Sequence, residues 1–282
     1  MKVSIKAQAK INLSLDILGK LPNGYHSVQM VMQSIPLCDT VDIEETEGDG
    51  IELICEKEGV PTDSRNTAYK AAQLFLDKTE IRRKIKITLH KQIPAAAGMA
   101  GGSTDAAAVL KGLNQLFNEP LDKEEALELC VKIGADVPFC FLGGCALCEG
   151  IGEVLTPIAP LENAYLVIAK PKGEVSTKWV YENFKMEKVS KHPNTQMVIE
   201  AVKMGDLKAL CENTANVLET VTQKEYPIIG EYKEKLSQNG AVVSMMSGSG
   251  PTVFGIFDNE EKAKNAYSTM KILTEDTFLL KV

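Results

Sequence analysis

The sequence predicts an α+β protein of two domains, with a boundary near residue 160. Its 282 residues exceed what one hydrophobic core usually spans. In the first half, strand-like alternation precedes helix-like runs that flank a stretch of small residues. In the second half, with extra helices treated as insertions, the expected elements follow the order βαββαβ, that of a ferredoxin-like fold. We therefore expect an N-terminal domain over residues 1–160 and a C-terminal ferredoxin-like domain over residues 161–282.

Composition and charge exclude several classes of function. Hydrophobic residues make up 44% of the chain and charged residues 24%, as in ordinary globular proteins. The net charge of −7 argues against broad nucleic-acid binding, which needs a basic face. No apolar run approaches the roughly 20 residues of a membrane span, and the N-terminus lacks the apolar segment of a signal peptide. We expect a cytoplasmic protein that binds neither nucleic acid nor membranes.

The N-terminal segment shows the clearest periodicity. Apolar and polar side chains alternate over residues 3–17, which predicts one long strand, or two joined by a bend, with one buried face. Lys10 and Asn12 share the other face, where exposure to solvent is the usual outcome for a lysine. Lys10 becomes a candidate functional residue only if a ligand covers that face.

A turn follows this strand. Pro22-Asn23-Gly24 is typical of a turn, and a second strand is expected over residues 28–35. Tyr25 and His26 lie between them. His26 is the histidine that adjoins both a turn and an aromatic residue, so ligand contact is an alternative to a structural role.

Two further strands and one helix are expected before the loop of small residues. Strands are expected around residues 41–44 and 51–55, with Gly48-Asp49-Gly50 as a hairpin loop between them. Asn66 is a plausible cap for a helix that runs to about residue 76.

A loop of small residues is the strongest functional signal. Residues 85–89 alternate like a strand before it, and residues 106–117 have helical spacing after it. The backbone N–H groups of such a loop and the positive end of the following helix bind anions, so the expected ligand is a nucleotide phosphate. Ser103 or Thr104 would cap the helix or offer a hydroxyl to a phosphate or metal. The loop is Pro94, Ala95, Ala96, Ala97, Gly98, Met99, Ala100, Gly101, Gly102, Ser103 and Thr104.

This loop matches neither of two common nucleotide-binding motifs. It has neither the Gly-Lys-Ser/Thr of a Walker A motif nor the spaced glycines and later acidic residue of a dinucleotide fingerprint. A structural alternative to phosphate binding therefore stays open, in which the small residues only allow a helix to pack closely on a sheet.

One acidic residue lies in an apolar turn. A helix with a capping box at Asp122 is expected to end at Gly134, and Asp136 follows in the stretch Gly134–Phe139. A carboxylate in such surroundings is costly without a partner. Asp136 is therefore either a helix cap before Pro138 or an acid held in a site, with Lys10 as a natural counter-charge.

The cysteines favour a structural role. The chain has seven, and Cys145-Ala-Leu-Cys148 formally matches a C-x-x-C pair. A zinc site would need further ligands, and no second paired motif is present. Both cysteines lie in a strand-like apolar run, where cysteine behaves as a small hydrophobe.

Several motifs, taken in order, resemble the GHMP kinase superfamily of small-molecule kinases. The resemblance runs from residue 7 to about residue 257. Within it, the turn Ser247–Pro251 fits a hairpin and could also present N–H groups to a phosphate. The motifs are Ala9-Lys10-Ile11-Asn12-Leu13, Asn23-Gly24-Tyr25-His26, Pro94–Thr104, Gly134–Phe139, Glu149-Gly150-Ile151-Gly152-Glu153 and Ser247-Gly248-Ser249-Gly250-Pro251.

The resemblance implies a fold and an activity. It implies an N-terminal mixed α/β domain of the ribosomal S5 domain 2-like type, followed by the ferredoxin-like domain. It also implies transfer of the γ-phosphate of ATP, with Mg²⁺, to a hydroxyl of a small cytidine-diphosphate-linked methylerythritol. This substrate belongs to the non-mevalonate isoprenoid route.

The resemblance also implies roles for individual residues. Asp136 would accept or orient the proton of the substrate hydroxyl, and Lys10 would keep Asp136 ionised and stabilise charge on the transferred group. Residues 94–104 would bind the ATP phosphates. The residues that would contact the substrate are Asn12, Tyr25, His26 and Tyr181, the last three through the cytosine base.

The sequence departs from the superfamily pattern at two positions of the loop. Ala100 stands where the superfamily often has Gly, and alanine allows close backbone approach if its φ is negative. Thr104 replaces a frequent Ser but keeps the hydroxyl.

Two alternative functions stay open. One alternative function is another kinase of the superfamily, of homoserine or mevalonate type. The other is a nucleotide-binding module without catalytic activity.

Overall fold

The chain consists of two compact units, each built from several segments. The computed structural model describes residues 1–22 and 24–282. One unit holds residues 1–9, 37–93 and 100–143, and the other holds residues 10–36, 94–99 and 144–282. The long strands β1 (Lys2–Lys20) and β2 (His26–Thr46) therefore contribute residues to both. The expected division at residue 160 stays a prediction.

The sheet of the first unit differs from the expected hairpin. The expected strands at residues 28–35 and 41–44 form the single strand β2. β3 (Gly50–Cys55) does not pair with β2, because β4 (Lys84–His90) lies between them in the order β3-β4-β2. β4 is antiparallel to β2 and parallel to β3, with Ile51 opposite Ile85. Parallel neighbours need a crossover, and α1 (Thr67–Thr79) supplies it.

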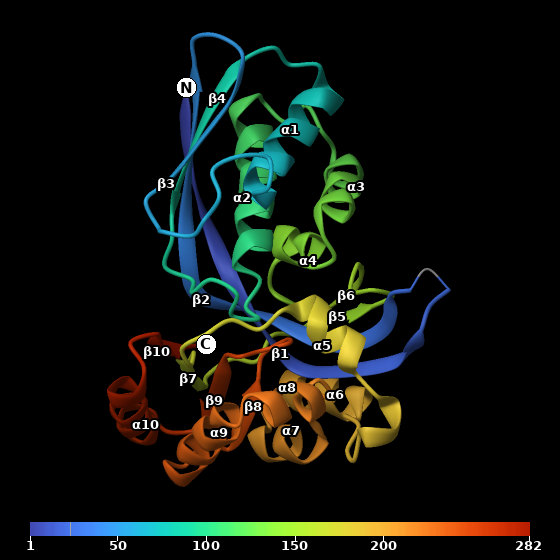
Figure 1. Cartoon of the computed structure of the whole chain (residues 1–282), viewed down its shortest axis with the longest axis vertical. Helices are drawn as coiled ribbons and strands as arrows, with labels where there is room; N and C mark the ends of the chain where they lie inside the picture. Colours follow the sequence, from blue (N-terminus) through green and yellow to red (C-terminus); the bar gives the residue numbers. More distant parts are fainter. Residues whose placement is uncertain (23) are drawn as a thin grey trace. The chain divides into compact units, whose positions relative to one another are not determined.

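Helices cover one face of this sheet (Figure 1). α1 and α2 (Gly101–Leu116) pack against each other, and α3 (Lys123–Ile133) and α4 (Val137–Leu142) complete the layer. The expected cap of α1 is confirmed: the Asn66 side chain accepts from the N–H of Ala68. The capping box at Asp122 and the end of α3 at Gly134 are confirmed as well. Phe75, Ile43 and Ile85 are among the fully buried side chains of this core.

The second unit begins with a small antiparallel arrangement. Residues 30–33 of β2 pair with β5 (Cys145–Glu149), and β5 pairs with β6 (Val154–Ile158). Pro157 lies within β6, although proline usually disfavours strand pairing. β6 ends the order of the sheet, and an edge strand tolerates a residue without an N–H group.

The ferredoxin-like arrangement at the C-terminal end is confirmed. β7 (Tyr165–Ala169), β8 (Val243–Met246), β9 (Val253–Phe257) and β10 (Thr277–Lys281) form the sheet order β10-β7-β9-β8. Each of these pairings is antiparallel. α9 (Ile228–Gln238) and α10 (Glu260–Leu273) pack on this sheet, so the order βαββαβ holds.

Short helices are inserted between β7 and α9. The helix expected over residues 207–217 is shorter, because it ends at Asn213 and a further helix follows it. No helix within the described residues is long and apolar enough to cross a membrane. The inserted helices are α5 (Thr177–Asn183), the 3₁₀ turn Met186–Lys188, α6 (Thr195–Met204), α7 (Leu207–Asn213) and α8 (Glu219–Glu225).

Candidate active site

The loop of small residues is shorter than expected, because α2 begins at Gly101. Residues 101–104 form the first helical turn, and the N–H of Thr104 already bonds to the carbonyl of Ala100. The expectation that Ser103 or Thr104 caps the helix is wrong. Ala100 occupies the capping position, and the Thr104 hydroxyl instead donates to the carbonyl of Gln8 at 2.8 Å.

The N-terminus of α2 therefore has no side-chain cap. The first N–H groups of a helix have no partner within the helix, and most long helices cover them with a polar side chain. α1, α3, α6 and α10 have such caps, whereas the capping residue of α2 is an alanine. The N–H groups of the first turn of α2, with the positive end of the helix dipole, form a site that favours an anion.

Two alanines of the loop adopt a left-handed backbone. Ala100 has a φ of 60° and Ala96 a φ of 47°. The condition under which alanine allows close backbone approach, a negative φ, is therefore not met at Ala100. A left-handed conformation costs a residue with a Cβ roughly 1–2 kcal/mol, and such strain persists only where the surroundings enforce it.

Gly98 connects the loop to the turn between β8 and β9. Its carbonyl oxygen accepts from Lys10 Nζ and from Ser247 Oγ, both at 3.0 Å. Gly98 has a φ of 69°, and a Cβ at this position would lie 2.2 Å from the carbonyl oxygen of Ser247. The hairpin turn expected at Ser247–Pro251 is confirmed, and it packs directly on the loop.

Lys10 and Asn12 are buried, although solvent exposure was the expected outcome. Their exposed fractions are 4% and 1%. Lys10 Nζ donates to Asn12 Oδ1 at 2.7 Å, and the Asn12 amide contacts the sulfur of Met30 at 3.2 Å. The carbonyl of Gly98 reaches Lys10 Nζ, and residues 214–217 hydrogen-bond to Leu13 and Leu15 of β1, contacts that alternation in β1 alone does not reveal. The oxygens around the Lys10 ammonium help to offset the cost of its burial.

Asn216 and Glu219 hydrogen-bond to the backbone at the turn between β8 and β9. The Asn216 amide donates to the carbonyls of Met246 and Gly248, both at 2.8 Å. Glu219 Oε1 accepts from the N–H of Met246 at 2.7 Å, and Glu219 Oε2 pairs with Lys233 at 2.5 Å. Sequence reasoning missed both residues, and no local pattern distinguishes them.

An aromatic group gathers around His26. The rings of His26 and Tyr181 lie 5.5 Å apart at 38°, and Phe184 lies 6.3 Å from His26, edge-on. Phe184 was missed, although its position three residues after Tyr181 was a usable signal. Burial, and then the charge of Lys20, lower the pKa of His26, so its ring is neutral at pH 7.

The other predicted residues of this segment are more exposed. Tyr25, which immediately precedes β2, is 61% exposed. Of the turn Pro22-Asn23-Gly24, Asn23 lies outside the described residues.

Asp136 precedes α4, and its side chain does not cap that helix. Its backbone is already helical, with φ −81° and ψ −14°, which is not the geometry of a capping residue. The residue is half-buried between α3 and α4. Asp136 therefore occupies the position of a helix cap before Pro138 but forms no side-chain capping hydrogen bond.

A buried trio of charges was not expected. Lys91 Nζ contacts Asp39 Oδ2 and lies 2.5 Å from Asp105 Oδ2. Burial raises the pKa of Asp105 to about 7; Lys91 opposes this shift and Asp39 adds to it. Burial acts to lower the pKa of Lys91, but attraction to Asp105 and Asp39 outweighs it and raises this pKa. Lys91 is therefore charged at neutral pH, and Asp105 takes up a proton far more readily than an exposed aspartate.

The cysteine pair is not arranged for chelation. Cys145 and Cys148 both lie in β5, and residues three apart on a strand point to opposite faces. Both are buried, and burial raises the pKa of the Cys145 thiol to about 12. The thiol form, which is not a metal ligand, therefore dominates at Cys145.

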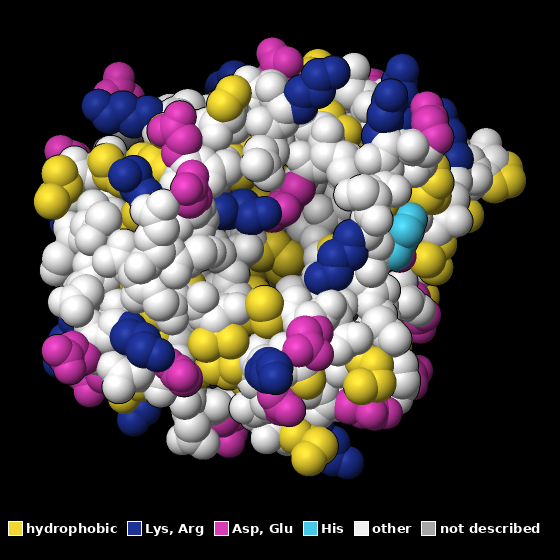
Figure 2. Space-filling view, turned by 90° about the horizontal axis from the view of Figure 1, so that it is seen from below, with side chains coloured by type: hydrophobic (Ala, Val, Ile, Leu, Met, Phe, Trp, Pro, Cys, Tyr) yellow, Lys and Arg dark blue, Asp and Glu magenta, His cyan; other side chains and the backbone are white. Residues whose placement is uncertain are grey.

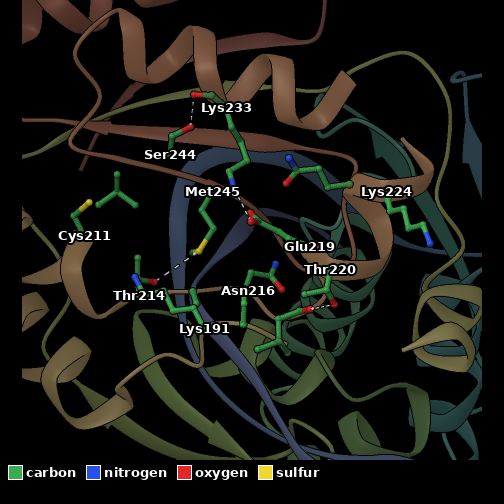
Figure 3. Close-up of a pocket in the computed structure, with 15 residues that line it drawn as sticks. Lys191, Cys211, Thr214, Asn216, Glu219, Thr220, Lys224, Lys233, Ser244 and Met245 are labelled. Atoms are coloured by element: carbon green, nitrogen blue, oxygen red, sulfur yellow. Dashed lines mark hydrogen bonds and ion pairs between the residues drawn. The ribbon is translucent and has the colours of Figure 1, made fainter. Parts of the chain in front are cut away.

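A pocket of about 630 Å³ in the second unit is lined in part by Asn216 and Glu219 (Figure 3). Among the described residues, its lining includes Lys191, Glu219, Lys224 and Lys233, and none of the predicted site residues. On the face that Figure 2 shows, positive and negative side chains are interspersed rather than gathered into one basic field.

Comparison with known families matches both halves of the chain. The family model for the GHMP kinases N terminal domain matches residues 66–144, and that for the GHMP kinases C terminal matches residues 198–274. A 4-diphosphocytidyl-2-C-methyl-D-erythritol kinase of Alkaliphilus metalliredigens is 49% identical over 279 residues, 99% of this chain and 96% of that relative. Its namesake from Acetivibrio thermocellus is 51% identical over 269 residues, 95% of each.

Solved structures show the same architecture. A crystal structure of a 4-(cytidine 5′-diphospho)-2C-methyl-D-erythritol kinase matches with a TM-score of 0.85 at 29% identity, covering 99% of this chain and 98% of that chain. A homoserine kinase from Cytophaga hutchinsonii matches with a TM-score of 0.82 at 19% identity, covering 100% and 95%. The second likeness shows the fold alone.

Replacing Gly98 by alanine should destabilise the protein through a steric clash. The added Cβ would meet the Ser247 carbonyl at 2.2 Å, and relief requires movement of backbone. Gly144→Ala is a matched control, because Gly144 has a similar φ of 75° and nothing within 4 Å of an added Cβ. We expect Gly98→Ala to lower the free energy of unfolding in urea by about 1–3 kcal/mol more than Gly144→Ala. Equal losses would contradict the clash.

The proton on Asp105 should make stability depend on pH. The folded-state pKa of about 7 lies above the ordinary value of 3.8. The stabilising effect of this proton is therefore complete below about pH 4 and is lost as pH rises through 7. We expect the stability of Asp105→Asn relative to the unsubstituted protein to increase from pH 5 to pH 7, by up to about 1 kcal/mol per pH unit. Urea unfolding at each pH measures this; a constant difference would contradict the raised pKa.

Proposed function

This chain belongs to the GHMP kinase family, and on that premise we propose that it transfers the γ-phosphate of ATP to the 2-hydroxyl of 4-diphosphocytidyl-2-C-methyl-D-erythritol. The reaction is a step of the non-mevalonate route to isoprenoid precursors. The observation that carries the proposal is the identity of 49–51% with kinases of that name over 95–99% of this chain.

The loop is the proposed site for the ATP phosphates. Phosphoryl transfer requires mainly positioning and stabilisation of charge. The uncapped first turn of α2 offers N–H groups for this purpose, and Lys10 offers a cation held against the carbonyl of Gly98. In a protein of net charge −7, positive potential for a polyanion has to be concentrated locally.

We assign the acceptor chemistry to Asp136. Its carboxylate takes or orients the proton of the acceptor hydroxyl as the hydroxyl oxygen bonds to the γ-phosphorus. The bond from that phosphorus to the β–γ bridging oxygen breaks, and ADP leaves. Lys10 stabilises the charge on the transferred group. Asp136 is half-buried immediately before α4.

The aromatic group is the proposed site for the cytosine base. A base binds by stacking on aromatic rings and by hydrogen bonds to its edge. Tyr181 and His26 already lie at ring-contact distance, and the neutral His26 offers both a donor and an acceptor. Tyr25 and Asn12 are the remaining proposed substrate contacts.

The arrangement fits Mg²⁺ that arrives with ATP. Within residues 1–22 and 24–282, no three His, Cys, Asp or Glu side chains form a group that would hold a metal ion. Mg²⁺ usually binds substrate phosphates with one or two protein groups and keeps several waters, so no protein cage is needed. The Ser103 hydroxyl, in the first turn of α2, is the protein group that we propose for it. When bound, the ion neutralises phosphate charge.

Two other functions remain as alternatives. Homoserine and mevalonate kinases share the fold, but their substrates carry no base, which leaves the aromatic group around His26 without a purpose. A module that only binds nucleotide would have no need for Asp136.

Turnover by the purified protein tests the proposal. We expect ATP consumption with the cytidyl-methylerythritol substrate and none with homoserine or mevalonate. Asp136→Asn should lower kcat by about 10²- to 10⁴-fold, the usual contribution of a general base, while ATP still binds. Tight ATP binding without turnover would favour the non-catalytic module. Turnover that survives in Asp136→Asn would still support the kinase activity but would reject the proposed role of Asp136.

Removal of one aromatic ring tests the base site. Base–aromatic stacking contributes about 1–3 kcal/mol per base, so Tyr181→Ala should raise the KM for the cytidyl substrate about 5- to 100-fold. The KM for ATP should not change. Trp179→Ala removes another half-buried ring from the same helix and serves as the control. Steady-state kinetics measure both, and equal effects in the two variants would reject the base site.

A further inference from the structure

The buried trio Asp39, Lys91 and Asp105 lies at both ends of the proposed phosphate loop. Lys91 and the two residues after it lead into Pro94, and Asp105 lies in α2, five residues after Ala100. The side chains of Asp39, Lys91 and Asp105 are 0%, 6% and 3% exposed. The trio is therefore part of the interior and not a surface ion pair.

Asp39 also binds the backbone where the loop begins. Its Oδ1 accepts from the N–H of Gln92 at 2.5 Å and from the N–H of Ile93 at 2.8 Å. Its Oδ2 contacts Lys91, whose Nζ also reaches Asp105 on α2. A chain of contacts thus runs from the backbone before the loop, through Asp39 and Lys91, to the helix after it.

Fold stability alone does not account for this arrangement. It contains two carboxylates and one ammonium, and Asp105 Oδ1 is buried without a hydrogen-bond partner among the described residues. Apolar side chains of similar volume are often at least as stabilising as buried ion pairs. What the trio provides, and apolar packing does not, is a directional link between two backbone segments.

We propose that Asp39, Lys91 and Asp105 are positioning residues that hold the two ends of the loop at the spacing the phosphates of ATP require, before the nucleotide binds. This inference rests on the proposed function only in taking residues 94–104 as the phosphate site. Ordering a loop during binding reduces affinity, so a loop ordered beforehand binds more tightly. Loss of the link should therefore weaken nucleotide binding without loss of the fold.

Substitutions at Asp105 test the link. Both Asp105→Ala and Asp105→Asn leave Lys91 paired with Asp39, so the remaining charges balance. Alanine removes the contact with Lys91, whereas the asparagine oxygen can still accept from it. We expect Asp105→Ala to raise the Kd for a nonhydrolysable ATP analogue about 10-fold, and Asp105→Asn to raise it less. Calorimetric titration without acceptor measures both, so the result does not depend on which substrate the enzyme phosphorylates.

Kinetics and a control separate positioning from general damage. In turnover assays the loss should appear in the KM for ATP, with kcat and the KM for the acceptor changed less than twofold. Asp42→Asn removes an aspartate three residues along the same strand, which pairs with Lys2 and His90 rather than with Lys91. It should leave the Kd for the analogue unchanged. An unchanged Kd in a folded Asp105→Ala protein overturns the proposal, and so does an equal rise in Asp42→Asn.

Hydrogen exchange on the unsubstituted protein decides the question if the variants fail to fold. If the ends of the loop are held beforehand, the N–H groups of Gln92 and Ile93 exchange slowly even without nucleotide. We expect their exchange rates to change less than threefold when the analogue binds. Fast exchange that becomes slow only on binding would show that the nucleotide, and not the trio, orders this segment, and would overturn the proposal.

Discussion

The carbonyl oxygen of Gly98 is the contact on which the candidate site depends. It accepts hydrogen bonds from Lys10 and Ser247, and so joins segments that are far apart in the sequence. The approach is possible only because position 98 lacks a side chain. The same contact gives the buried Lys10 side chain an oxygen acceptor in place of water. The Gly98 carbonyl thus fixes both the position of the Lys10 ammonium and the contact between the loop and the turn at Ser247.

Much of the fold could be predicted because its signals are local. The capping side chains of Asn66 and Asp122 mark helix starts within three or four residues, and both predictions are confirmed. The βαββαβ order needs only the sequence of elements, and the sheet order β10-β7-β9-β8 follows from it. The expected hairpin between β2 and β3 failed because β4 inserts between them. A glycine-containing turn does not reveal which strand becomes the neighbour.

The site was harder to predict, because burial of its residues is decided by distant segments. Lys10 lies on the polar face of an alternating strand, and the carbonyl that it contacts, that of Gly98, lies 88 residues away in the sequence. Asp39 is the opposite case. It takes the apolar position in the alternation of Ile35, Leu37, Val41 and Ile43, and that signal was present in the sequence. An acidic residue in the buried phase of a strand indicates a buried charge that needs a partner, and Lys91 is that partner.

Several departures from ordinary local rules lie in or beside one loop, although left-handed non-glycine residues also occur elsewhere, at Glu80, Asn118, Glu119 and Asn163. α2 starts without a side-chain cap, and Ala96 and Ala100 have left-handed backbones. Lys10, which contacts the loop at Gly98, is buried. Asp39 and Asp105, which lie near the two ends of the loop, are buried as well. Each of these features costs stability by itself. Natural sequences keep such conflicts mainly where function requires them, while the rest of the chain follows its propensities. An uncapped helix start has orphan N–H donors. An anion bound at these donors offsets part of the costs, which is the physical reason to propose the loop as a binding site rather than as a tight packing contact.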